Sequence, residues 1–137
     1  MTVSLVVAGA GIRGVTYARH AVAGGRARVV AVAEPDPRRR ARFAAEFGVP
    51  AGRAFADWTH LVAAGRLADA AVITTQDHLH EAPAVALAGL GYHILLEKPM
   101  APTERAAATI AAAVSAAGVI FAVCHVLRYT PYTAALR

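Results

Sequence analysis

The stretch that decides the fold is "VVAGAGIRGVTYA", Val6–Ala18, in which glycines stand at positions 9, 11 and 14. A β-rich apolar run precedes the glycines, and apolar residues at helical spacing follow them. In such a corner Gly9 permits a tight turn, Gly11 lets the backbone approach a phosphate, and Gly14 allows close helix–strand packing. Glu34 lies 20 residues after Gly14, at the end of the next apolar run. This arrangement predicts a dinucleotide-binding loop.

Outward from this loop, β-rich apolar runs alternate with segments of helical periodicity. The apolar runs are nearly continuous in Val, Ile, Leu and Ala, which is typical of parallel strands covered by helices on both faces. We therefore predict an α/β fold with a doubly wound parallel sheet, the Rossmann NAD(P)-binding fold. The expected strands are 3–8, 28–33, 70–75, 92–96 and 119–123, and the expected helices are 11–23, 37–47, 58–64, 78–88 and 104–117.

Glu34 and the arginines that follow it bear on the choice of cofactor. A carboxylate at this place accepts hydrogen bonds from the adenosine ribose and repels a 2′-phosphate, so NAD is favoured over NADP. The run "DPRRRAR" then brings in Arg38, Arg39, Arg40 and Arg42. They form either a solvated helix face or, for Arg38 or Arg39, a group that accommodates the phosphate of NADP. No aromatic residues lie among them, so nucleic-acid binding is not favoured.

Polar residues also follow the later apolar runs. They are Thr74, Thr75, Gln76, Asp77, His78 and His80 after the third run, Glu97-Lys98-Pro99 after the fourth, and His125 after the fifth. In a doubly wound sheet these corners converge on one crevice beyond the carboxyl ends of the strands. Asp77 has an alternative explanation as the N-cap of the next helix. His78 and His80 are only two residues apart and no other cluster has metal-ligand spacing, so no metal is predicted.

Taken together, these motifs resemble one family, the Gfo/Idh/MocA (glucose–fructose oxidoreductase/inositol dehydrogenase) oxidoreductases. The matching positions cover essentially the whole chain and run in the family's order. They are Gly9-x-Gly11-x-x-Gly14, Glu34, Thr75 with His80, Glu97-Lys98-Pro99, and His125-x-x-Arg128-Tyr129-x-Pro131. The Glu-Lys-Pro corner is far more specific than the glycine loop. The chain departs from the family at Thr75-Gln76-Asp77, where Thr-Pro-Asn is usual, so the rigid turn and the amide near the nicotinamide are altered.

The resemblance implies an NAD(P)-dependent oxidoreductase that transfers hydride between nicotinamide and a hydroxyl or carbonyl of a sugar, cyclitol or similar small molecule. It implies that Lys98 is catalytic, because an ammonium there would hydrogen-bond the reacting oxygen and support proton transfer. It also implies a cis Lys98–Pro99 bond. The residues expected to bind the cofactor are Gly9, Gly11, Ile12, Arg13, Gly14, Glu34, Arg39, Thr74, Thr75, Asp77, His80, Glu97, Lys98, Pro99 and Arg128.

The resemblance further implies a second, substrate-binding domain that is absent from this chain. We expect residues 1–127 to form the Rossmann domain and 128–137 to begin the connection, since a helical pattern starts at Pro131 without a terminal signal. The chain alone is then expected to be inactive, with the small-molecule substrate and any oligomer depending on the missing domain. The alternative is a stand-alone dinucleotide-binding module that senses redox state or regulates a partner.

Composition sets the remaining expectations. A chain that is 57% hydrophobic and 17% charged is not disordered, and a net charge of +5 suggests an anionic ligand. The single cysteine, Cys124, rules out an internal disulfide and suits the reducing cytoplasm; we expect a buried, inert thiol. Residues 106–124 carry no charge, but Gly118 divides them, so a helix and a strand are expected there and no membrane span. Trp58 is expected to pack in the core.

Overall fold

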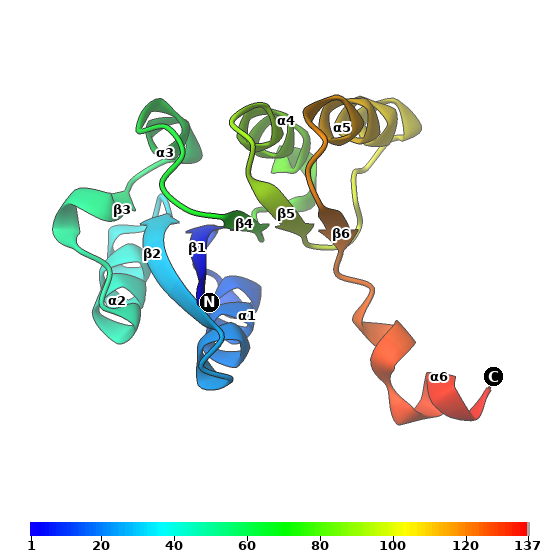
Figure 1. Cartoon of the computed structure of the whole chain (residues 1–137), viewed down its shortest axis with the longest axis horizontal. Helices are drawn as coiled ribbons and strands as arrows, with labels where there is room; N and C mark the ends of the chain where they lie inside the picture. The colour runs from blue at the N-terminus through cyan, green and yellow to red at the C-terminus, as the bar shows by residue number, and fades with distance from the viewer. Residues whose placement is uncertain (137) are drawn as a thin grey trace.

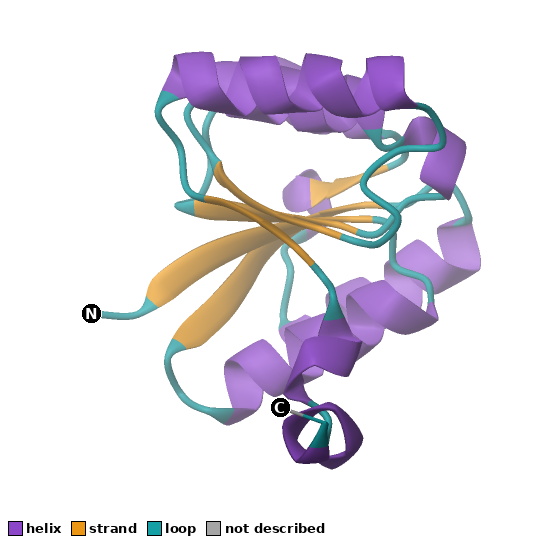
Figure 2. Ribbon diagram, turned by 90° about the vertical axis from the view of Figure 1, so that its right-hand side faces the viewer, coloured by secondary structure: helices purple, strands orange, loops and turns teal. Residues whose placement is uncertain are grey.

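The computed structural model describes residues 1–136 and shows a sheet between two layers of helices (Figure 2). The strands are β1 Val3–Ala8, β2 Ala27–Ala33, β3 Ala54–Phe55, β4 Ala70–Ile73, β5 His93–Leu96 and β6 Phe121–Val123. The helices are α1 Ile12–Ala23, α2 Pro37–Phe47, α3 Trp58–Ala63, α4 Glu81–Gly89, α5 Glu104–Ala117 and α6 Pro131–Ala135. Three short 3₁₀ turns are η1 Ala51–Arg53, η2 Asp77–Leu79 and η3 Val126–Tyr129.

The sheet has the strand order β3-β2-β1-β4-β5-β6, and every neighbouring pair is parallel. From β1 the chain builds outward through β2 and β3, then returns to the other side of β1 and builds outward through β4, β5 and β6 (Figure 1). This reversal makes a topological switch point between β1 and β4, the place where ligands of such sheets bind. The predicted doubly wound sheet is confirmed.

Two hydrophobic cores lie on the two faces of this sheet. Along β1, Leu5 and Val7 belong to the core beneath α1 and α2, whereas Val6 belongs to the core beneath α3, α4 and α5. Successive side chains of a strand point to opposite faces, so a strand buried on both faces must be apolar at every position. That requirement explains why the strands read as continuous apolar runs.

Capping residues mark the ends of the two longer helices that follow β2 and β5. The Asp36 side chain accepts a backbone N–H of α2 at 2.7 Å, and Thr103 accepts one of α5 at 3.2 Å. Gly48 and Gly118 end these two helices with φ of 66° and 63°, a conformation that favours glycine. Gly118 thereby divides the uncharged stretch into α5 and β6. Within residues 1–136 no helix is both long enough and apolar enough to cross a membrane.

Several boundaries differ from the prediction. Strand β3 was not expected, because two residues paired to β2 are too few to show a period. The helix expected from His78 begins at Glu81, because residues 77–79 close the η2 turn through the Leu79 N–H and the Gln76 carbonyl, 2.8 Å apart. The interpretation of Asp77 as the N-cap of α4 is therefore wrong. His80 stands at the cap position and makes no side-chain capping bond.

The chain leaves the sheet after β6. This strand is shorter than expected because the Val119 N–H instead bonds the last turn of α5. Segments η3 and α6 then run away from the sheet, on the side that carries α1 and α2 (Figure 1). Residues 126–136 carry exposed apolar side chains: Val126, Leu127, Tyr129, Tyr132 and Leu136. The domain boundary placed after residue 127 falls inside η3 and stays a prediction.

Candidate functional site

The glycine loop, between β1 and α1, packs closely against other parts of the protein, mainly against backbone atoms. Gly9 has φ +98°, and a Cβ added there would lie 2.7 Å from the Thr74 carbonyl oxygen. A Cβ on Gly14 would overlap the Gly9 carbonyl oxygen and lie 2.8 Å from Thr74 Oγ1. A Cβ on Gly11 would meet nothing within 4 Å. Protein packing therefore demands Gly9 and Gly14, whereas the open space at Gly11 leaves room for a ligand.

The N-terminus of α1 is uncapped beside this open space. Gly11 is the N-cap residue and makes no side-chain hydrogen bond, and the first turn holds no acidic residue. The first N–H groups of a helix lack partners within the helix, and the helix dipole adds partial positive charge. An anion such as a pyrophosphate fits these donors. Thr74 fixes the loop from the next strand, since its hydroxyl donates to the Gly9 carbonyl at 2.7 Å.

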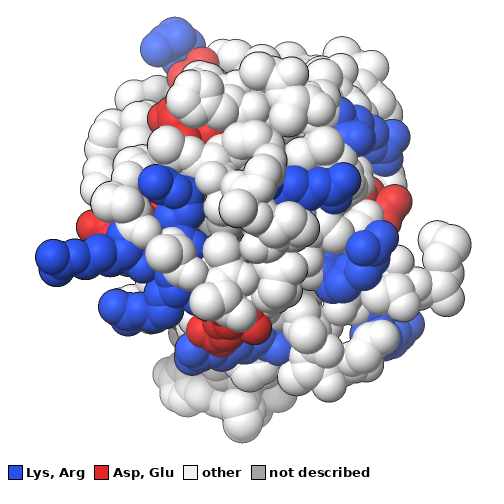
Figure 3. All heavy atoms as spheres, turned by 90° about the vertical axis from the view of Figure 1, so that its left-hand side faces the viewer, with Lys and Arg blue, Asp and Glu red and all other residues white. Residues whose placement is uncertain are grey.

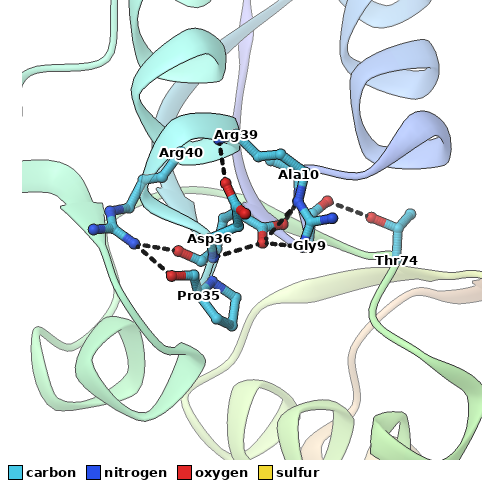
Figure 4. A network of polar contacts seen from close by, with 8 residues as sticks. Gly9, Ala10, Pro35, Asp36, Arg39, Arg40 and Thr74 are labelled. Atoms are coloured by element: carbon cyan, nitrogen blue, oxygen red, sulfur yellow. Dashed lines mark hydrogen bonds and ion pairs between the residues drawn. The ribbon is translucent and has the colours of Figure 1, made fainter.

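Glu34, at the end of β2, is almost fully buried, with 3% of its surface exposed. Its Oε2 accepts the Ala10 N–H at 2.7 Å, and its Oε1 accepts the Asp36 N–H at 3.0 Å and Arg39 Nη2 at 2.9 Å (Figure 4). The Arg39 side chain is 56% exposed, and the neighbouring carboxylate raises the pKa of its guanidinium. Glu34 thus ties the glycine loop to the start of α2.

These corners enclose a cavity of about 360 Å³, here called the glycine groove. Its lining is Gly9, Gly11, Ala33, Glu34, Pro35, Arg39, Asp57, Trp58, Thr74, Thr75, Gln76 and Leu79. Six predicted cofactor residues meet there: Gly9, Gly11, Glu34, Arg39, Thr74 and Thr75. Trp58 was predicted to pack in the core; it does so and lines the groove as well. Because β3 was not recognised, its corner at Asp57 and Trp58 was missed.

The arginines of α2 point to different parts of the protein and make different contacts. Arg39 turns to Glu34, and Arg40 bonds the carbonyl oxygens of Glu34 and Pro35 (Figure 4). Arg42 lines a separate hollow between α1 and α2, together with the exposed Ile12. Lys and Arg side chains on the face seen in Figure 3 are interrupted by neutral and acidic atoms. Only Arg39 of the α2 arginines lines the glycine groove.

A second cavity, here called the lysine hollow, lies beyond β5 and β6. It measures about 580 Å³ and is lined by Arg13, Lys98, Cys124, His125, Val126, Leu127 and Arg128. Three predicted site residues, Arg13, Lys98 and Arg128, meet there. Lys98 is exposed, and it is the only lysine of the sequence. Cys124 is a buried free thiol, as predicted, and burial raises its pKa.

Glu97 and Pro99 flank Lys98 within the protein. The Glu97 carboxylate, 7% exposed, accepts the Tyr17 hydroxyl at 3.1 Å, pairs with Arg13 Nε at 3.4 Å, and accepts the Lys98 N–H. The Lys98–Pro99 bond is cis, as the resemblance implied. Tyr17 carried no signal in the sequence, because its partner lies 80 residues away.

His80 and Asp77 lie outside both cavities. The buried His80 ring joins two corners: Nδ1 is 2.8 Å from the Pro99 carbonyl oxygen and Nε2 is 3.1 Å from that of Thr75. Asp77 is exposed on η2. The cofactor contacts expected of both residues stay predictions. Among residues 1–136 no three His, Cys, Asp or Glu side chains gather as a metal site.

Comparisons with known proteins agree with this geometry. The model of the oxidoreductase family with an NAD-binding Rossmann fold, GFO_IDH_MocA, matches residues 3–125. Inositol 2-dehydrogenase 1 of Saccharopolyspora erythraea is 39% identical over 104 residues, which are 75% of this chain and 30% of that protein. The chain thus spans under a third of that relative's length.

Solved structures extend the likeness over almost the whole chain. The WlbA dehydrogenase from Bordetella pertussis, in complex with NADH and UDP-GlcNAcA, matches 99% of this chain at 26% identity, with a TM-score of 0.89. Biliverdin reductase from a Synechocystis species, in complex with biliverdin and NADP+, matches 98% at 25% identity, with a TM-score of 0.86. The matched parts are 41% and 42% of those two chains, respectively.

Proposed function

This chain belongs to the Gfo/Idh/MocA oxidoreductase family, and from that premise we propose that it is the cofactor-binding part of a hydride-transferring enzyme. The cofactor is NAD or NADP. The proposed reaction interconverts a hydroxyl and a carbonyl on a sugar, cyclitol or similar small molecule. The observation that carries the proposal is the open side of Gly11 next to the uncapped N-terminus of α1.

The residues of the glycine groove would hold the dinucleotide. The N–H groups at the start of α1 would bind the pyrophosphate, and Glu34 would accept hydrogen bonds from the adenosine ribose. Thr74 would keep the loop in place through its bond to Gly9. Arg39 already neutralises part of the Glu34 charge, but the Glu34 carboxylate still lines the glycine groove, so we favour NAD over NADP.

Lys98 would serve the reacting end of the site. When bound, the nicotinamide accepts or gives the hydride. The Lys98 ammonium would hydrogen-bond the reacting oxygen and move a proton at its Nζ, which stabilises a developing alkoxide. Arg13 and Arg128 add positive charge around the same hollow. The cofactor roles predicted for Ile12, Arg13, Gly14, Asp77, His80, Glu97, Pro99 and Arg128 remain part of this proposal.

The names of two relatives support the proposed substrate class. One is an inositol dehydrogenase, which acts on a cyclitol by its name, and one was solved with a nucleotide sugar acid. Residues outside this chain would complete the substrate pocket, and any oligomer would form through them. The single free cysteine fits a reducing compartment, so we propose a cytoplasmic location.

Calorimetry on the purified chain tests the cofactor proposal. We expect saturable NADH binding and a weaker affinity for NADPH. Gly11→Ala should fold normally, because its Cβ meets no protein atom, but should bind NADH about tenfold or more weakly where the methyl group meets the cofactor. Gly24→Ala is the matched control, since its Cβ also meets nothing within 4 Å and it lies outside the groove. A folded chain that binds neither dinucleotide would refute the proposal.

A further inference from the structure

The buried carboxylate of Glu97 stands between the glycine loop and Lys98. It lies at the carboxyl end of β5 and is satisfied by donors from the protein itself. A carboxylate this buried is stable only where donors or cations compensate its charge. The identity of those donors therefore shows what holds the Lys98 corner in place.

Tyr17 supplies the donor from α1. Its hydroxyl lies 3.1 Å from Glu97 Oε1, and its ring packs at the edge of the core beneath α1 and α2. Burial, ahead of the contacts with Cys124 and Glu97, raises the pKa of this hydroxyl above its ordinary value. The group therefore keeps its proton at neutral pH and acts as a hydrogen-bond donor to the carboxylate.

Arg13, in the first turn of α1, adds an ion pair to the same carboxylate. Its Nε lies 3.4 Å from Glu97 Oε1, and the side chain is 54% exposed where it lines the lysine hollow. Arg13 stands between Gly11 and Gly14, the two glycines that frame the proposed pyrophosphate site. One side chain thus touches the Glu97 carboxylate and extends from the first turn of α1, whose N-terminus would bind the pyrophosphate.

Glu97 in turn bonds the backbone of Lys98, the residue with the proposed catalytic side chain. Its Oε2 accepts the backbone N–H of Lys98, the residue whose side chain lines the hollow. We propose that Tyr17 is a positioning residue, which orients Lys98 through the Glu97 carboxylate, and that Arg13 joins this group to the start of α1. The inference rests on the proposed function, in which Lys98 works beside the nicotinamide.

Removing the Tyr17 hydroxyl should therefore change the orientation of Lys98 indirectly, through Glu97. In Tyr17→Phe the Glu97 Oε1 keeps only its ion pair with the exposed Arg13, so the carboxylate is free to turn toward water. The Lys98 N–H then loses an acceptor of fixed position, and the corner gains conformational freedom. The loss of one hydrogen bond corresponds to about a two- to tenfold change in an equilibrium that depends on it.

The experiment uses the fact that Lys98 is the only lysine. Protein labelled with ¹³C-lysine gives one side-chain spin system by NMR, which reports on Lys98 alone. The spectra are recorded for wild type, Tyr17→Phe and Tyr92→Phe, with and without NADH. Tyr92 is a matched control: its buried hydroxyl donates to the Gly65 carbonyl at 3.0 Å and accepts the Leu67 N–H at 2.7 Å, outside both cavities.

We expect the Lys98 signal to shift and broaden in Tyr17→Phe and to remain as in wild type in Tyr92→Phe. NADH affinity should fall about two- to tenfold in Tyr17→Phe only. Glu97→Gln, which keeps the shape of the side chain but removes its charge, should move the same Lys98 signal and serves where Tyr17→Phe folds poorly.

Two results would overturn the inference: an unchanged Lys98 signal in both Tyr17→Phe and Glu97→Gln, or an equal change in Tyr92→Phe. Either result, with normal NADH binding by the wild type, leaves the proposed function standing. If the wild type binds no dinucleotide, the proposed function fails, and the inference fails with it because Lys98 then has no cofactor to face.

Discussion

Around the glycine groove the contacts are made by backbone and buried atoms, whereas around the lysine hollow the charged side chains are exposed. A Cβ added at Gly9 or Gly14 would meet backbone atoms or the Thr74 hydroxyl, and Glu34 is 3% exposed. Lys98 and Arg128 are exposed, and the hollow is bordered by Leu127, which is 73% exposed. Folding therefore fixes the first region to within small tolerances. The geometry of the lysine hollow depends on a few hydrogen bonds and ion pairs, chiefly those of Glu97.

The largest effect that this difference predicts is a loss of stability in Gly14→Ala. The added Cβ would overlap the Gly9 carbonyl oxygen, a backbone atom that cannot move without the whole loop. We expect a destabilisation of roughly 3 kcal/mol or more, measured by urea unfolding followed by circular dichroism. Gly89→Ala is the control, because its Cβ meets nothing within 4 Å, and it should be as stable as wild type or more so. A stable Gly14→Ala would show that the loop is not tightly packed.

A smaller loss is expected when the carboxylate of the glycine groove is removed. Glu34→Ala leaves the Ala10 N–H without its acceptor, at a cost of about 1–3 kcal/mol by urea unfolding. Glu46→Ala is a matched control, since this carboxylate also pairs with an arginine, Arg19, but on the surface. Its removal should cost clearly less, because an exposed ion pair is screened by water. Equal losses in the two variants would mean that burial of Glu34 adds nothing.

The same difference explains how much the sequence could predict. The glycine groove depends on local signals: a strand, three glycines, a helix, and an acid after the next strand. Pattern and spacing reveal all of these. The place of Trp58 in the groove was not predicted, because the preceding strand, β3, has only two residues. The role of Tyr17 was missed for another reason: its bond to Glu97 spans 80 residues and exists only in the folded chain.

Low pH should destabilise helices α2 and α3, which begin beside the glycine groove. A backbone N–H of α2 lowers the pKa of Asp36, and contacts with Thr59 lower that of Asp57. Carboxyls with a lowered folded pKa stabilise the fold above their unfolded value, near 3.8, and that stability is lost as the pH falls below it. We expect unfolding free energies to decline from pH 5 to pH 3. The decline should be shallower in Asp36→Asn, which keeps the cap but cannot titrate. Parallel curves for the two proteins would contradict this origin of acid sensitivity.

The smallest effect on stability is expected at Lys98, the residue with the largest proposed chemical role. Within the described residues 1–136, Lys98 Nζ makes no hydrogen bond or ion pair, because Glu97 engages the Lys98 backbone instead. Lys98→Met should therefore change the unfolding free energy by less than about 0.5 kcal/mol in urea. In a polypeptide that also carries a substrate domain, the same change should lower turnover by about a hundredfold or more. A clear loss of stability would instead assign the lysine to the fold. A silent Lys98→Met beside a disrupted Gly14→Ala would show that one region is maintained by packing and the other only by what it binds.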